Sequence, residues 1–149
     1  MKCLCYVDDL ARMTTDELER FIEDQFPGGR SHWRIDRLGD AELDVRLPFR
    51  EDFLRPGGTI SGPVMMGLAD TAAYMLILSM IGPVALAVTT SLNINFMRRP
   101  SPEELIARTR MLKLGRQLAV VDVQISLAAS DVLVAQATVT YSIPPAKPA

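Results

Sequence analysis

The sequence predicts an α+β fold in which one curved antiparallel sheet wraps around a long, buried helix. Three observations carry this prediction. The segment 63–81 is apolar on every side, which is typical of a helix surrounded by protein. Residues 31–49 alternate apolar and polar side chains around Gly39 and Asp40, as a hairpin of two half-exposed strands does. Residues 84–143 hold four further β-rich segments, for which we expect an antiparallel meander.

A shorter helix is expected ahead of the hairpin, at about 14–26. Thr14 or Thr15 can cap its start, and Glu17 stands three residues after Thr14, which is a capping-box spacing. Apolar residues then recur at helical intervals until a Pro-Gly-Gly turn, which ends the helix. Between the hairpin and the central helix, the turn formers of 50–59 predict a loop.

The chain length fits a single domain. With 149 residues the protein can bury a sizeable core but is too short for two ordinary domains. The composition, 48% hydrophobic and 23% charged, is typical of a globular protein. We therefore expect one domain over residues 1–143, followed by a disordered, proline-containing tail over 144–149.

Charge and cysteine content argue against several classes of function. A formal net charge of −2 offers no basic field to nucleic acid or to an anionic membrane. The two cysteines, Cys3 and Cys5, cannot make up a disulfide framework or a zinc site, so we expect a reducing cytoplasm and no metal. The first residues carry one lysine and then acids, without the apolar run of a signal peptide.

The central apolar segment raises the question of a membrane span. From 64 to 81 it approaches the roughly 18 residues at which a spanning helix becomes a candidate. Asp70 lies near its middle, where a charge would cost about 2.5 kcal/mol or more in lipid. No cluster of Lys or Arg flanks either end. We therefore expect a helix of a soluble fold, buried on all sides.

Asp70 is the one charged residue of this helix, and two interpretations of it compete. In the first, it is a structural acid that accepts hydrogen bonds from a neighbour such as Thr71 or from a strand, as buried polar groups usually do. In the second, it is a general base or nucleophile. The start of the helix favours the second, because Gly62 lies where free backbone N–H groups can hold a developing oxyanion.

Helix geometry separates these two groups. Asp70 follows Gly62 by eight residues, so that the two lie roughly 12 Å apart along one helix. A single carbonyl cannot meet both groups of the same chain. If both act on one substrate, they must come from two copies whose helices run antiparallel in a symmetric dimer, which then has two shared sites.

Four segments carry a resemblance to a known family. They are SGPVMMGLAD (61–70), AVTTSLNINFMRRPS (87–101), LKLGR (112–116) and VAQATVTYS (134–142). In their order and spacing they resemble the hotdog-fold acyl-CoA thioesterases of the phenylacetate-degradation (PaaI-like) group, over about 35–143. The resemblance implies the hotdog fold and hydrolysis of an acyl-CoA thioester to free acid and CoA, without metal or bound cofactor. It also implies a homodimer, with dimers pairing into a tetramer.

The resemblance implies roles for three residues. In the family an acid of the central helix acts on water or directly on the thioester carbonyl, and Asp70 matches it. A backbone N–H at the helix start polarises that carbonyl across the dimer, and Gly62 matches it. A hydroxyl near the start of the next strand helps to place water in some relatives, and Thr89 falls at that position.

The sequence departs from the family at the start of the helix. The family's His-Gly-Gly is here Ser61, Gly62 and Pro63. Ser61 can bind substrate or cap the helix, and Pro63 stiffens the turn but lacks an N–H. Arg55 stands where some relatives carry an amide side chain that orients water. These changes leave the acid in place and bear on rate and substrate choice.

Further residues are candidates for binding the substrate. Four basic residues stand at strand ends or turns, where they can hold the phosphates of CoA or remain solvated charges. They are Arg98, Arg99, Lys113 and Arg116. Met66 and Tyr74 can line an acyl pocket or pack in the core. Ser61 and Arg55 complete this candidate binding set.

Two rival functions stand beside hydrolysis. A hotdog protein that binds acyl-CoA without turnover, as a ligand sensor, needs the same pocket but not the acid. Ser61 stands in place of the family histidine, and this change favours keeping the sensor as an alternative. A structural or assembly role predicts neither binding nor turnover. Hydratases of this fold pair an acid with a histidine, and the one histidine here, His32, lies far from Asp70 in sequence.

Overall fold

The structure is a computed structural model that describes residues 13–26 and 33–145. Cys3, Cys5, His32 and the tail residues 146–149, for which the sequence gives predictions, lie outside the described residues. The elements are α1 (Thr15–Gln25), β1 (Arg34–Gly39), β2 (Glu42–Leu47), a 3-10 turn η2 (Glu51–Phe53), β3 (Leu54–Arg55), β4 (Thr59–Ile60), α2 (Gly62–Ile81), β5 (Val88–Phe96), β6 (Leu105–Leu114), β7 (Leu118–Leu127) and β8 (Leu133–Ser142).

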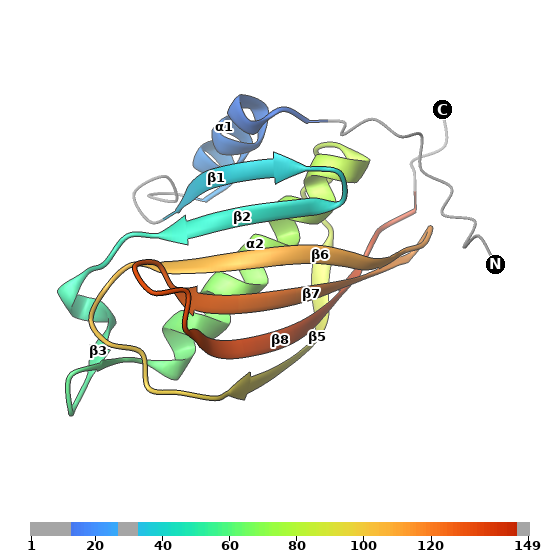
Figure 1. Cartoon of the computed structure of the whole chain (residues 1–149). Helices are drawn as coiled ribbons and strands as arrows, with labels where there is room; N and C mark the ends of the chain where they lie inside the picture. Colours follow the sequence, from blue (N-terminus) through green and yellow to red (C-terminus); the bar gives the residue numbers. More distant parts are fainter. Residues whose placement is uncertain (1–12, 27–32, 146–149) are drawn as a thin grey trace.

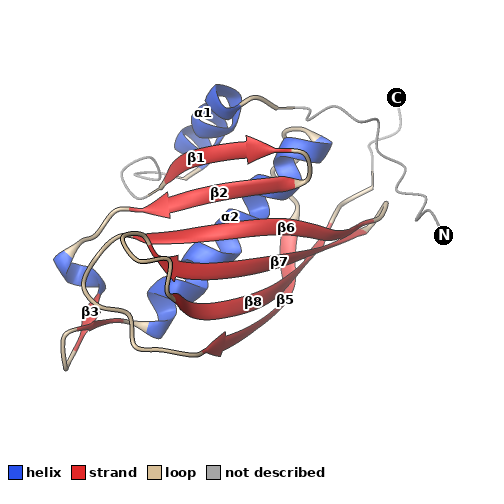
Figure 2. Ribbon diagram, viewed as in Figure 1, coloured by secondary structure: helices blue, strands red, loops and turns tan. Residues whose placement is uncertain are grey.

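Six strands form one curved antiparallel sheet in the order β1-β2-β6-β7-β8-β5, and α2 runs across its inner face (Figure 1). The inward residues of each strand alternate with outward ones, as the burial patterns of β2 and β8 illustrate. Figure 2 shows the two layers, with the sheet in red in front of the long helix in blue. The predicted α+β hotdog arrangement, a sheet wrapped around a central helix, is confirmed.

The position of β5 corrects the expected four-strand meander. Strands β6, β7 and β8 follow one another as a meander, but β5 pairs with β8 at the far edge and not with β6. The connection 97–104 therefore carries the chain back past two strands, a lateral distance of about 14 Å. Local alternation of side chains identifies a strand but does not reveal its neighbour. Among the described residues, β5 lies at the edge of the sheet.

Helix α2 fills the space enclosed by the sheet. Eleven of its 20 residues are buried, and the sequence Ala72–Ser79 is buried without interruption. By length and composition α2 could cross a membrane, but 61% of its most apolar window is buried against the rest of the chain. A core helix of a soluble protein passes that same test of length and composition.

One stripe of α2 stays uncovered, which corrects the expectation that the helix is buried on all sides. Its members follow the i, i+3, i+4, i+7, i+8 spacing of one helix face. They are Pro63, Met66, Gly67, Asp70 and Thr71, all intermediate or exposed. A sheet that curls around a helix closes over most of its circumference, and this remaining face is open to solvent in the single chain.

The smaller elements close the ends of the structure. The predicted capping box of α1 is present: the backbone N–H of Thr14 donates to Glu17 Oε2 at 2.7 Å, and the N–H of Glu17 donates to Thr14 Oγ1 at 3.3 Å. The buried side chains of α1, Leu18 and Ile22, lie on its inner face. The segment 50–59 is more ordered than the predicted loop, because it holds η2 and most of the short β3–β4 hairpin.

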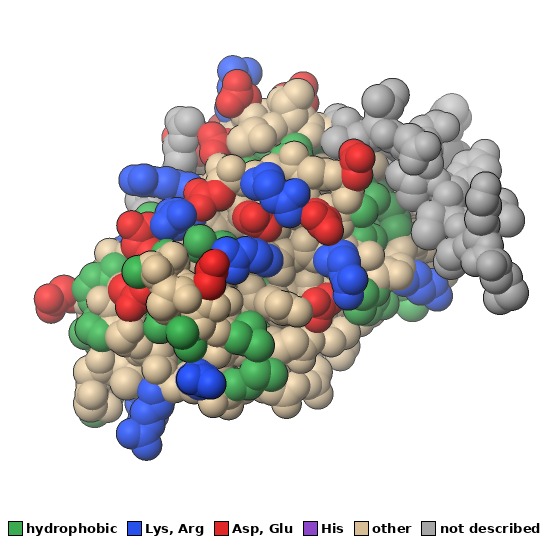
Figure 3. All heavy atoms as spheres, in the orientation of Figure 1, with side chains coloured by type: hydrophobic (Ala, Val, Ile, Leu, Met, Phe, Trp, Pro, Cys, Tyr) green, Lys and Arg blue, Asp and Glu red, His purple; other side chains and the backbone are tan. Residues whose placement is uncertain are grey.

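The outer face of the sheet is polar and mixed in charge. Figure 3 shows Lys and Arg side chains interspersed with Asp and Glu over β1, β2 and β6. Several are paired across strands: Arg46 lies 2.8 Å from Asp36, and Arg37 lies 2.8 Å from Glu42. Opposite charges therefore lie side by side on this face and partly offset one another.

Candidate active site

Asp70 lies on the open stripe of α2 and faces the start of β5. Its Oδ1 accepts a hydrogen bond of 2.6 Å from the Thr89 hydroxyl. The same oxygen accepts a second hydrogen bond, of 2.7 Å, from the hydroxyl of Tyr141 in β8. The other oxygen, Oδ2, accepts none from the described part of the chain. The structure thus brings the predicted Asp70 and Thr89 into direct contact.

A β-bulge is what turns Thr89 toward the helix. In β5 the inward residues Leu92 and Ile94 pair with the buried Val139 and Ala137 of β8. Strict alternation from these residues would turn Thr89 outward. The register shifts between Thr89 and Ser91, so that Thr89 stands opposite the buried Tyr141. Directly opposed residues share a face, and both hydroxyls therefore reach Asp70.

Gly62 and Ser61 form the N-terminus of α2, at the other end of the sheet. Ser61 is the N-cap, and its Oγ accepts from the backbone N–H of Val64 at 3.4 Å. The N–H of Gly62 donates to no acceptor among residues 13–26 and 33–145. A Cβ at Gly62 would lie 3.3 Å from Phe96 Cζ, so glycine lets the last ring of β5 pack against this turn.

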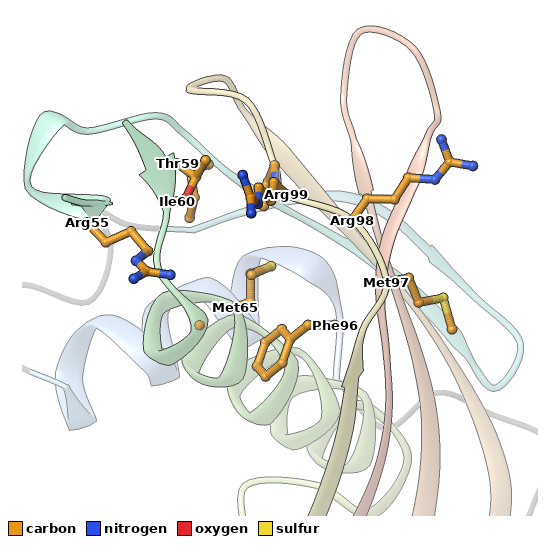
Figure 4. A pocket seen from close by; sticks show the side chains of 10 residues that line it. Arg55, Thr59, Ile60, Met65, Phe96, Met97, Arg98 and Arg99 are labelled. Carbon is orange, nitrogen blue, oxygen red and sulfur yellow. The ribbon is translucent and has the colours of Figure 1, made fainter. Parts of the chain in front are cut away.

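A cavity of about 340 Å³ opens beside Gly62, and three predicted binding residues, Arg55, Arg98 and Arg99, contribute to its wall. The remaining lining is largely apolar and includes Met65 and Phe96. Figure 4 shows Arg55 extending over the first turn of α2, and Arg98 pointing outward. None of these three arginines pairs with a described acidic residue. Their charges are therefore available to an anion.

The other predicted binding residues lie elsewhere. Lys113 and Arg116 line a separate cavity of about 410 Å³ at the β6–β7 hairpin, which is at the Thr89 end of the sheet. Met66 is 41% exposed on the open stripe. Tyr74 is buried and its hydroxyl donates to the carbonyl of Ala85 at 3.2 Å, so within one chain it packs in the core. The acyl-pocket roles of Met66 and Tyr74 stay predictions.

The sequence reasoning missed Tyr141 as a partner of Asp70. Burial raises the pKa of the Tyr141 hydroxyl far above its usual range, and the negative charge of Asp70 raises it further. The hydroxyl therefore stays protonated and acts as a donor. The sequence did offer one signal. Tyr141 follows Val139 and Ala137 at intervals of two residues, so it lies on the same inward face of β8. The bulge that brings Thr89 beside it leaves no such signal.

Metal ligation finds no support in the part of the chain that the structure describes. Within it, no three His, Cys, Asp or Glu side chains come close enough to hold an ion. The predicted absence of a cofactor stays a prediction.

Comparison with known proteins identifies the family. The profile of the thioesterase superfamily matches residues 57–134, which include α2 with Asp70, β5 with Thr89, and the next two strands. The chain belongs to the thioesterase superfamily. This membership supports thioester hydrolysis as its general activity.

Solved structures agree with this assignment. A candidate thioesterase from Silicibacter sp. TM1040 is 43% identical, with a TM-score of 0.85 over 92% of this chain and 96% of that one. A candidate thioesterase related to phenylacetic acid degradation, from Ralstonia eutropha JMP134, is 26% identical, with a TM-score of 0.68 over 74% and 84% of the two chains. A thioesterase-like protein of Streptococcus pneumoniae TIGR4, solved with coenzyme A, is 19% identical with a TM-score of 0.70 over 89% and 98%, and shares the fold.

The hydrogen bond at Ser61 predicts a capping role. Ser61→Ala removes the acceptor for the Val64 N–H and should lower the free energy of unfolding by about 1 kcal/mol. Ser61→Asn keeps a capping oxygen and should stay near the parent. Urea unfolding followed by circular dichroism measures both. Full stability of Ser61→Ala together with a raised KM for a thioester substrate would instead assign Ser61 to substrate binding.

Proposed function

We propose that this protein hydrolyses acyl-CoA thioesters in the cytoplasm, as a homodimer in which each site combines Asp70 of one copy with Gly62 of the other. One observation carries the proposal. Within the described residues, Asp70 has a carboxylate oxygen and Gly62 an N–H without a hydrogen-bond partner, yet about 12 Å of helix separates them within one chain. Two copies related by a two-fold axis bring such groups together.

The surface of the single chain supports this dimer. β5 is an edge strand whose outer backbone groups pair with no described strand. Exposed apolar residues lie along it and on the neighbouring open stripe: Val88 (53%), Phe96 (49%), Met97 (52%) and Met66 (41%). An edge strand flanked by exposed apolar side chains is otherwise an aggregation hazard. A second copy would cover both the edge and the stripe.

The register of β5 supports the shared site. If two β5 strands pair antiparallel around Leu92, Thr89 of one copy lies opposite Asn95 of the other. Phe96 follows Asn95, and it packs against Gly62 in its own chain. Thr89 in turn donates to Asp70 in its own chain. The pairing therefore draws Gly62 of the second copy toward Asp70.

In the proposed reaction Asp70 acts as the general base. It removes a proton from a water molecule whose oxygen attacks the thioester carbonyl carbon, and the carbonyl π electrons move to the oxygen. The N–H of Gly62 of the second copy stabilises this oxyanion, as donors at a helix start can. When the oxyanion collapses, the C–S bond breaks, and the CoA thiolate leaves with the proton that Asp70 had taken.

The unpaired basic residues support CoA as the thiol carrier. In such a dimer, Arg98 and Arg99 of one copy approach the sheet end that carries Lys113 and Arg116 of the other. CoA bears phosphates, which arginine binds through paired N–H groups. The coenzyme A complex of the Streptococcus pneumoniae protein, which has the same fold, is consistent with this choice.

Replacement of the acid tests hydrolysis directly. Asp70→Asn should lower kcat for thiol release by about 10² to 10⁴, because the amide cannot accept the proton of water. The assay follows free thiol with a chromogenic reagent over short, long and aromatic acyl-CoAs. Asp131→Asn is the matched control, since Asp131 is exposed, pairs with Arg108 at the surface, and has a positive φ that asparagine tolerates.

The outcomes of this screen separate the rival functions. Wild-type turnover by Asp70→Asn, on a substrate that the parent hydrolyses, would rule out the assigned role. Saturable binding of acyl-CoA by the parent without thiol release would favour a ligand sensor. Neither binding nor release would favour a structural role.

Mixing two inactive variants tests the shared site. Asp70→Asn lacks the acid, and Gly62→Pro lacks the N–H at a helix position that tolerates proline. After subunit exchange in an equal mixture, half of the dimers contain one copy of each variant and one intact site, so activity should recover to about a quarter of wild type. Gly62→Ala keeps the N–H and controls for the contact with Phe96. No recovery, despite heterodimers detected by native mass spectrometry, would place both groups in one chain's site.

Shortening the thiol carrier tests the phosphate contacts. Arg99→Gln should reduce kcat/KM about tenfold for an acyl-CoA, since a hydrogen bond to a charged group is lost. The same acyl group on N-acetylcysteamine, which has no phosphate, should be hydrolysed equally by parent and variant. Arg108→Gln is the control, because Arg108 pairs with Asp131 on the surface. Equal losses on both substrates would contradict a phosphate-binding role.

A further inference from the structure

The carboxylate of Asp70 is held by two hydroxyls on one of its oxygens. Thr89 and Tyr141 donate to Oδ1 at 2.6 and 2.7 Å. The Tyr141 hydroxyl also lies 3.0 Å from the backbone carbonyl oxygen of Asp70, so it ties the side chain to its own turn of α2. Oδ2 accepts no hydrogen bond from residues 13–26 and 33–145. The two oxygens of one carboxylate are therefore unequal.

Tyr141 is fixed both in position and in protonation. Its side chain is 4% exposed, and its ring stacks on Tyr74 with centroids 5.8 Å apart and planes inclined by 23°. It stands opposite Thr89 in the β5–β8 ladder and opposite Ala119 in the β7–β8 ladder. Because burial raises its pKa, the hydroxyl keeps its proton over the range in which hydrolases work.

The titratable surroundings of this pair are few. Tyr74 on α2 is the further titratable group that acts on Tyr141, and burial raises the pKa of Tyr74 as well. On β5, the polar group that faces Asp70 and Tyr141 is the Thr89 hydroxyl. Among the described residues, the buried polar side chains of β2, β6, β7 and α1 are Thr109 and Ser126, and neither is titratable. Asp70 forms no ion pair with a described residue.

We propose that Tyr141 is a positioning residue that, with Thr89, occupies Oδ1 and leaves Oδ2 as the oxygen that takes the proton from water. The inference rests on the proposed function and assigns the reacting atom within it. A carboxylate oxygen that already accepts two hydrogen bonds has little lone-pair capacity left. Water is therefore held and deprotonated at Oδ2, and the leaving thiolate recovers its proton from the same atom.

The Thr89 and Tyr141 hydroxyls, which together form a clamp on Oδ1, also fix the direction of the acid. The carboxylate of Asp70 has no cation beside it among the described side chains, so the two hydroxyl donors are the groups that hold it. Removing one donor lets the carboxylate turn, and a general base works only when its accepting oxygen is aimed at the water.

Tyr141→Phe removes this one hydroxyl and keeps the ring. We expect kcat for thiol release to fall about tenfold with KM unchanged, because Oδ2 is aimed less well once one donor to Oδ1 is lost. Infrared difference spectroscopy supplies a second readout. The carboxylate stretching bands of Asp70, assigned from Asp70→Asn, should shift because Oδ1 accepts one hydrogen bond fewer. The infrared reading needs no turnover, so it tests the clamp even if the protein hydrolyses none of the thioesters offered.

Thr109→Val is the matched control for loss of a buried hydroxyl. Thr109 is 3% exposed, and its Oγ1 donates to the Leu43 carbonyl at 2.8 Å without touching Asp70. It should lower the melting temperature and leave both kcat and the Asp70 carboxylate stretching bands unchanged. If Tyr141→Phe behaves in the same way, Tyr141 is merely structural and the proposal is overturned.

Thr89→Val provides a second test in an exposed position, in case Tyr141→Phe does not fold. It removes the other donor to Oδ1 and should shift the Asp70 carboxylate stretching bands in the same direction. If Thr89→Val leaves these bands unchanged, Oδ1 is not clamped in solution and the proposal fails.

Discussion

The domain is organised by the need to cover one helix whose side chains are apolar in nearly every direction. A six-stranded sheet curls around α2 and buries eleven of its 20 residues, and burial of apolar side chains is the main force that holds such a domain together. The sheet reaches around to β5 and stops there, so that a stripe of the helix and the edge of the last strand lie exposed side by side. The only charged residue of the helix, Asp70, lies on that stripe.

The proposed chemistry follows from the rigidity of α2. A straight helix keeps its N-terminus and its ninth residue at a fixed separation, so Gly62 and Asp70 cannot approach each other by any local rearrangement. β5 links the two ends, because Phe96 packs on Gly62 and Thr89 donates to Asp70. The strand that would pair the copies is thus also the strand that touches both halves of the proposed site. Assembly and site geometry are coupled through one element.

Much of the fold could be predicted from the sequence, since it depends on local patterns. The apolar run of α2, the capping box at Thr14 and the alternation within β2 and β8 each identify an element from neighbouring residues alone. The pairing of β5 could not be predicted in this way, because strand order is decided by contacts between distant segments. The order of strands along the chain suggested a meander, and the long return through 97–104 overruled it.

The candidate site was predictable only where local sequence identifies a residue. Asp70 stands out because it is the one charged residue of an apolar run, and Gly62 stands out because it begins that run. The partners of Asp70 come from strands 19 and 71 residues away in sequence, where a hydroxyl has no distinguishing neighbour. Burial patterns reveal that Tyr141 points inward, but a one-residue irregularity in another strand decides that Thr89 joins it.

That irregularity makes the register of β5 matter more than its composition near position 90. The bulge changes which face Thr89 occupies by adding one residue, whatever its side chain, between it and Ser91. Loss of the bulge with every residue kept would place Thr90 opposite Tyr141 and turn the Thr89 hydroxyl to the outer face. Deletion of residue 90 would instead leave Thr89 opposite Tyr141 in a plain ladder. The approach of Thr89 to the acid therefore depends on how many residues separate it from Ser91 and on whether the extra one bulges.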